Sequence, residues 1–177
     1  MNNIINIIGK IFNLYAMIFG MKGLLKKYVT SSEVIRENGK KITVLVLNSA
    51  ALLKDGILQY HLAGGLCATV GNTIIVLDTV KSSTSSNDLG FMMNHEIGHL
   101  VLGHVAKAVK NGASGTVLDL EDEVAADNYA RSKGFKSPDF RKLLTGVYGE
   151  LATAGIILAD KVADYVNETL EVHASRM

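Results

Sequence analysis

Runs of apolar residues in the first half of the chain predict strands. Residues 41–47 and 73–78 are both rich in β-branched and apolar side chains, which is typical of strands in a sheet. A weaker extended stretch, residues 66–70, lies between them and is bounded by turns that contain glycine. The pattern therefore predicts a small sheet, with helices in the rest of the chain.

A helix is expected to follow the last of these strands. Residues 81–87 are polar and predict a loop, and Ser85 followed by Asp88 has the form of a capping box, so the helix should begin near residue 87. Apolar positions then recur with helical spacing over residues 89–108. This spacing predicts one continuous helix up to about residue 110.

Two further helices are predicted in the C-terminal half. Residues 119–134 begin with acidic side chains, which favour the start of a helix. Ser137 and Pro138 have the residue types of an N-cap and a first helical position. The last helix is expected to run to about Val172, with a kink or break at one of three glycines, Gly146, Gly149 or Gly155.

The N-terminal segment differs in composition from the rest. Residues 4–21 are mostly apolar, with one narrow polar stripe of Asn6, Lys10 and Asn13. Three interpretations stay open: a helix buried in the core or in a self-associated oligomer, a helix that lies in or crosses a membrane interface, or a cleaved signal. We therefore divide the chain into an N-terminal apolar helix, residues 1–27, and a domain of residues 28–177.

Composition narrows the classes of function. A chain of 177 residues, 48% apolar and 20% charged, has the size and composition of one globular domain. Its 18 basic and 17 acidic residues argue against binding to nucleic acid. The single cysteine, Cys67, excludes an internal disulfide and is expected to be a small core residue. Cytoplasmic and membrane-associated locations both stay open.

The segment His95-Glu96-Ile97-Gly98-His99 carries the clearest chemical signal. In a helix, the two histidines lie four positions apart on one face, so that both rings can reach one cation, with a carboxylate beside the first. Neutral imidazoles suit zinc, and a catalytic zinc site needs a third protein ligand. The pattern therefore predicts one Zn²⁺ per chain.

Two residues are candidates for the third ligand. His104 lies five positions after His99, about 140° around a continuous helix, and is therefore expected to point away and not to be a ligand. Glu123 begins the next predicted helix, and Asp127 follows it by one turn on the same face. We expect Glu123 to be the third ligand and Asp127 to accept the free N–H of a ligating histidine.

These motifs resemble those of a known family. The stretch from His95 to His104, followed by Glu123-Val-Ala-Ala-Asp127, is similar to the H-E-x-x-H and E-x-x-A-D pair of gluzincin peptidases of the HtpX and CAAX-prenyl-protease type. The resemblance covers about residues 41–145. It implies an α+β, zincin-like (minigluzincin) fold, in which a small mixed sheet packs on an active-site helix and the C-terminal half is helical.

The resemblance implies a zinc-dependent endopeptidase that acts on polypeptides. Zinc lowers the pKa of bound water to about 7, and Glu96 is expected to act as general base and then general acid. An edge strand at residues 73–77 is expected to pair with an extended substrate. The residue that stabilises the oxyanion stays open among Tyr148, Arg141, His173 and Arg176.

Two other functions remain possible at this point. Residues 123–130 also fit the pattern of the ImmA/IrrE type of peptidase, which cleaves a repressor. Alternatively, the chain could be a non-catalytic regulatory or structural protein with a zinc fold, in which residues 4–21 bind a partner. Glu96 argues against this alternative, because a residue that is not a ligand has little structural use beside the metal.

Overall fold

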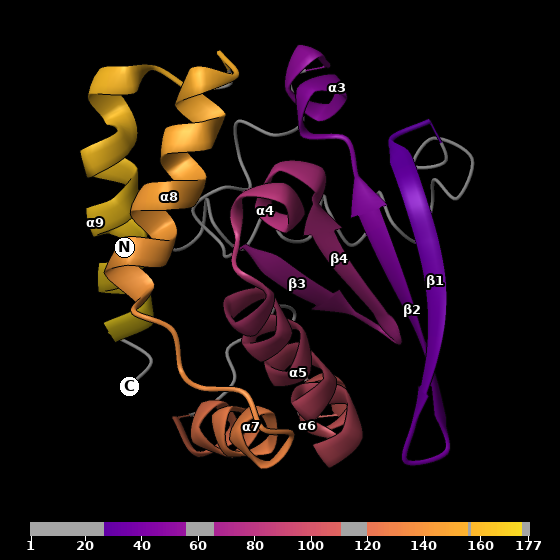
Figure 1. The fold of residues 1–177 in the computed structure, drawn as a ribbon. Coiled ribbons are helices and arrows are strands. Elements are labelled where there is room, and N and C mark those ends of the chain that lie inside the picture. Colours follow the sequence, from indigo (N-terminus) through magenta and orange to yellow (C-terminus); the bar gives the residue numbers. More distant parts are fainter. Residues whose placement is uncertain (1–26, 56–65, 111–119, 156, 175–177) are drawn as a thin grey trace.

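The structure is a computed structural model that describes residues 27–55, 66–110, 120–155 and 157–174 (Figure 1). The segment 4–21 lies outside the described residues, so the apolar helix and its role at a membrane or in self-association stay predictions. The division of the chain at residue 27 also stays a prediction. Within the described part, no helix is both long enough and apolar enough to cross a membrane.

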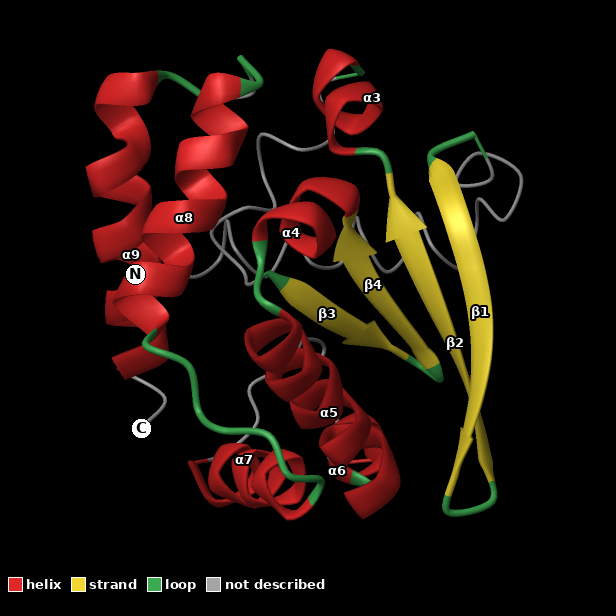
Figure 2. Ribbon diagram, in the orientation of Figure 1, coloured by secondary structure: helices red, strands yellow, loops and turns green. Residues whose placement is uncertain are grey.

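In the described part of the chain, four strands form a mixed sheet in the order β1-β2-β4-β3 (Figure 2). The β1–β2 and β4–β3 pairs are antiparallel, whereas β2 and β4 are parallel. The bounds are Val29–Glu37 for β1, Lys40–Leu47 for β2, Cys67–Val70 for β3 and Thr73–Leu77 for β4.

The prediction that residues 73–77 form an edge strand is wrong. Strand β4 pairs with β2 on one side and with β3 on the other, and its central residues Ile74, Ile75 and Val76 are buried. Of the described strands, β3 lies at this end of the sheet. A continuous apolar run such as that of β4 is typical of an inner strand, whose two faces are both covered.

Strand β1 was not predicted from the sequence. Most of its side chains are exposed, so it lacks the apolar pattern of the other strands. Its turn to β2 consists of Asn38 and Gly39, which have φ angles of 49° and 76°. Positive φ at both central residues is typical of the tight turn of a two-residue hairpin, and Asn-Gly is the pair that this turn favours.

The other described elements are helices, and the structure confirms an α+β class with a small mixed sheet and a largely helical second half. Helix α4 shows that the predicted polar loop over residues 81–87 is wrong at its start. The bounds are Ser49–Lys54 for α3, Asp78–Ser83 for α4, Ser86–Leu102 for α5, His104–Lys110 for α6, Leu120–Ser132 for α7, Phe140–Thr153 for α8, Ala159–Lys161 for the 3₁₀ helix η3 and Val162–Ala174 for α9.

Helix α5 begins as predicted and ends earlier than predicted. The Ser85 hydroxyl accepts a hydrogen bond from the Asp88 backbone N–H and donates one to the Asp88 carboxylate. At the other end, Gly103 has a φ of 83° and terminates the helix, so that residues 89–108 are not one helix. Lys40, from the start of β2, donates to the last carbonyl groups of α5, those of Leu100 and Val101.

The start of α8 also differs from the prediction. Asp139 is the N-cap, because its side chain accepts a hydrogen bond from the Lys142 backbone N–H. Ser137 instead accepts hydrogen bonds from the Arg131 side chain. The predicted break within the last helical segment occurs at Gly155, which has a φ of 70°.

Two clusters of buried side chains hold the sheet to its helices. One cluster joins the sheet to α8 and α9, and the other joins it to α5. In the second cluster, Ile97 and Leu100 of α5 pack against Ile42, Val44 and Ile74 of the sheet. Helix α5 is therefore fixed on the sheet through the residues that flank His99.

A glycine permits a close approach between α5 and α7. A Cβ atom built on Gly98 would lie 3.1 Å from the Ala126 Cα and 3.1 Å from the Tyr129 Cβ. At Gly90, near the start of α5, a Cβ atom would overlap the ring of Phe135, which follows α7. The atoms that face Gly98 are a backbone Cα and a side-chain Cβ, and such atoms have little freedom to move.

We predict that Gly98→Ala destabilises the protein, whereas Gly146→Ala stabilises it. Both glycines are inside helices, but a Cβ at Gly146 would have nothing within 4 Å. Alanine should therefore stabilise α8 by up to about 1 kcal/mol. At Gly98, overpacking costs about 1–3 kcal/mol and exceeds that gain. Denaturant unfolding of both variants checks the prediction, and equal stabilisation would contradict the close contact.

Candidate metal centre

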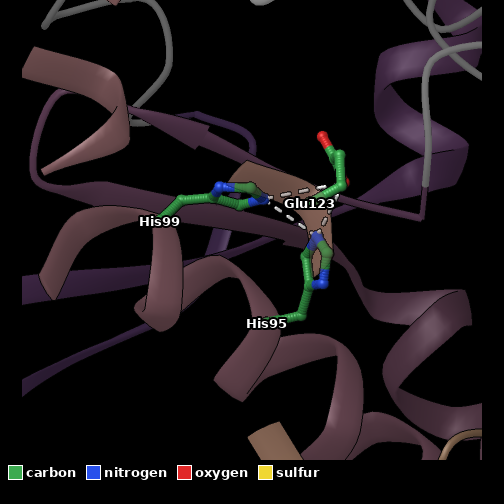
Figure 3. Close-up of side chains that lie close together, drawn as sticks. All are labelled: His95, His99 and Glu123. Carbon is green, nitrogen blue, oxygen red and sulfur yellow. Dashed lines mark hydrogen bonds and ion pairs between the residues drawn. The ribbon is translucent and has the colours of Figure 1, made fainter. Parts of the chain in front are cut away.

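Helices α5 and α7 bring together three side chains that the sequence analysis assigned to a metal. His95 and His99 lie one turn apart on α5, and Glu123 lies in the first turn of α7. The two Nε2 atoms are 2.9 Å apart, and Glu123 Oε2 lies 3.3 Å from His95 Nε2 and 3.8 Å from His99 Nε2. Figure 3 shows the three groups converging on one point. Among the described residues, they form a group close enough to hold a metal ion.

The dimensions and chemistry of this group fit zinc. Ligand atoms about 2.0–2.1 Å from a tetrahedral zinc lie about 3.4 Å from one another, a value within the range of the three observed separations. Two imidazoles and one carboxylate are a donor set of catalytic zinc sites. The His95 and Glu123 side chains are 16% and 17% exposed, whereas His99 is 4% exposed. The group is thus partly exposed to solvent through His95 and Glu123, but metal binding itself stays a prediction.

The outer nitrogen of His95 is held by a carboxylate. His95 Nδ1 lies 2.9 Å from Asp127 Oδ1, and Arg131 donates to the other oxygen of Asp127 at 3.1 Å. Asp127 therefore lies where the sequence analysis expected it, one turn after Glu123 and beside a histidine. A bond of this kind fixes the orientation of a ligating ring, so that its Nε2 faces the group.

The outer nitrogen of His99 contacts another histidine. His99 Nδ1 lies 3.0 Å from the Nδ1 of His104, and both side chains are buried. His104 is outside the group that could hold a metal, as predicted, but the continuous helix assumed in that prediction is wrong. Gly103 ends α5, and His104 begins α6 in a new direction that brings its ring to His99. The sequence pattern does not show that Gly103 adopts a left-handed conformation, and the position of His104 depends on this conformation.

The surroundings of the two histidines separate their pKa values. For His95, burial lowers the pKa, but hydrogen bonds to Asp127 and Glu123 outweigh it and raise the pKa to about 10. For His99, burial and then the charge of His95 lower the pKa to about 4. When no metal is bound, the proton on His95 supplies the positive charge among these carboxylates. A bound metal cation would replace this proton.

Glu96 lies next to His95 in the sequence and is not part of the group of three, and a residue of the sheet holds its side chain. Its Oε2 accepts a hydrogen bond of 2.5 Å from the hydroxyl of Thr69, which is on β3. Cys67 lies on the same strand and packs against the core cluster, as expected for a small apolar residue. Burial, followed by the charge of Glu96, raises the pKa of the Cys67 thiol. The carboxylate of Glu96 therefore lies between α5 and the end strand of the sheet.

Of the four candidates for oxyanion stabilisation, the structure describes the side chains of Tyr148 and Arg141, and both form hydrogen bonds to α9. Tyr148 is fully buried and its hydroxyl bonds to Thr169, which ties α8 to α9. Arg141 is exposed and donates to Asn167 of α9. The side chain of His173 and all of Arg176 lie outside the described residues. Tyr148 cannot contact a substrate in this conformation.

Comparisons of the chain with models of protein families, with curated proteins and with solved structures found no match. The assignment of function therefore rests on the motifs and on the geometry of the site.

We predict that the full chain binds one zinc ion and that Glu123→Ala removes this site. Loss of a direct ligand should weaken binding at least as much as loss of an outer partner, which costs about 10–100-fold. Glu121→Ala is the matched control, because Glu121 is an exposed carboxylate in the same turn of α7. Zinc content and chelator competition are the measurements. Equal zinc affinity in both variants would exclude Glu123 as a ligand.

Proposed function

We propose that this protein is a zinc-dependent endopeptidase with a zincin-like, minigluzincin architecture. The observation that carries the proposal is the convergence of His95, His99 and Glu123 from two helices, with Glu96 adjacent and outside the group. A site built only to hold a metal has no need of a further carboxylate that is not a ligand. Peptide hydrolysis needs one, to move protons.

The residues of the centre would have separate roles. His95, His99 and Glu123 would hold the ion, which when bound acidifies water and polarises a carbonyl group. Glu96 would take a proton from the attacking water at its carboxylate and give that proton to the leaving amine. General acid–base catalysis of this kind contributes about 10²–10⁴-fold to a rate. Asp127 would keep His95 in position.

The arrangement of the sheet supports a polypeptide substrate. Strand β3 lies at the end of the described strand order, and Thr69 brings it into contact with Glu96. An extended peptide that pairs with the outer side of β3 would pass beside this carboxylate. Pairing of backbone with backbone gives affinity with little dependence on side chains, so we expect broad specificity.

Glu96→Gln is expected to retain zinc and to lose peptidase activity by about 10²–10⁴-fold, because the amide cannot accept the proton. The measurements are zinc content and the rate of cleavage of an unfolded polypeptide such as casein. Activity equal to that of the unaltered protein would refute the role of Glu96. Zinc binding without cleavage in either protein would instead favour a non-catalytic zinc fold, and cleavage of a transcriptional repressor alone would favour the repressor-cleaving type.

Thr69→Val is expected to lower the rate of cleavage by roughly tenfold. The variant loses the hydrogen bond from the Thr69 hydroxyl to the charged Glu96 carboxylate, and this bond orients Glu96. Valine has the shape of threonine and suits a strand, so β3 should be retained. Thr73→Val, the same change on the neighbouring strand, serves as control. The measurement is kcat on casein, and an equal effect of both substitutions would count against an orienting role for Thr69.

A further inference from the structure

A chain of polar side chains leads from His99 to the surface. His104 lies between His99 and Asp122, with its Nδ1 3.0 Å from His99 Nδ1 and its Nε2 3.5 Å from Asp122 Oδ1. Lys107 then donates to both oxygens of Asp122, at 3.1 and 3.2 Å. His99, His104 and Asp122 are 3%, 7% and 7% exposed, so water has little access to the contacts between them.

The charges around His104 favour one direction for its contact with His99. A carboxylate only accepts and an ammonium only donates, so Asp122 accepts from Lys107. At 3.5 Å, the Asp122 carboxylate also favours a proton on the facing Nε2 of His104. A neutral imidazole that carries its proton on Nε2 accepts at Nδ1. His104 Nδ1 therefore accepts from His99 Nδ1–H. With the proton of His99 on Nδ1, the Nε2 of His99 directs a lone pair toward His95 and Glu123.

We propose that His104, held by Asp122, is the positioning residue that fixes the tautomer and the ring orientation of His99 as a metal ligand. This inference rests on the proposed function, since it assigns His104 a role at the same site. His104 does not itself bind the metal, because its Nε2 faces Asp122 and its Nδ1 faces His99.

The backbone supports this assignment. Gly103, in the left-handed region, directs α6 so that the His104 ring meets His99 at an angle of 66°, with ring centroids 5.2 Å apart. Asp122 immediately precedes Glu123 in α7, so one helical turn provides both the candidate ligand and the carboxylate that holds His104. The two candidate ligands His99 and Glu123 are thereby oriented by the same contact between helices.

Two substitutions at His104 separate positioning from packing. Leucine keeps the bulk of the side chain but has no acceptor, whereas asparagine places an oxygen close to the position of the histidine Nδ1. We expect His104→Leu to weaken zinc binding by about 10–100-fold, as loss of an outer-shell partner does. We expect His104→Asn to bind zinc nearly as tightly as the unaltered chain. The measurement is competition with a chelator of known affinity, and thermal unfolding of the metal-free variants monitors the fold.

The outcomes distinguish this inference from the proposed function. Unaltered zinc affinity in His104→Leu, or an equal loss in both variants, would overturn the role of His104 while leaving the zinc site in place. If the unaltered chain binds no zinc, the proposed function fails, and the inference fails with it. A loss confined to His104→Leu supports the inference, because packing alone does not require an acceptor.

A spectroscopic measurement tests the proton positions directly. In ¹⁵N–¹H spectra of the zinc-loaded full chain, we expect His99 to carry its proton on Nδ1 and His104 to carry its proton on Nε2. Asp122→Ala should disturb the His104 signals, whereas Glu121→Ala should not. Protonation of His104 at Nδ1, with Nε2 unprotonated, would overturn the inference.

Discussion

The contact between Gly98 of α5 and the backbone of α7 at Ala126 is the constraint on which the candidate centre depends. His95 and His99 flank this glycine, and Glu123 lies one turn before Ala126, so the distance between the two helices sets the distance between the rings and the carboxylate. The opposite side of α5 packs on the sheet. Helix α5 is thus fixed on both sides. A change of a few tenths of an ångström in the distance between the helices at Gly98 would directly displace the ligand atoms.

Charge is distributed around the candidate centre in a regular way. Each histidine directs Nε2 to the group and its other ring nitrogen to a polar partner. From His95 the contacts lead to Asp127 and then to Arg131, and from His99 they lead through His104 to Asp122 and Lys107. Each of these two series of contacts therefore ends in a cation at the surface. The partly buried carboxylates thus have partners, as buried charges require.

The sequence predicted the features that depend on local chemistry. The start of α5 at the Ser85 cap and the inner strands followed from spacing and side-chain type. Strand β1 was missed because it buries little apolar surface, although Asn38-Gly39 was a usable hairpin signal. The order of the strands, which made β4 an inner strand, depends on long-range pairing that no local pattern carries.

The residues of the site also differ in whether local sequence patterns predict their positions. The helical spacing of His95 and His99 predicted that they share a face, whereas the position of His104 depended on one backbone angle at Gly103. This junction has a consequence for changes in chain length. One residue inserted or deleted between Leu102 and His104 would change the direction in which α6 leaves α5 and carry the His104 ring away from His99, because that direction depends on the left-handed conformation of Gly103. The connection between these two helices therefore has little tolerance for insertions and deletions, even at positions where side chains can be exchanged.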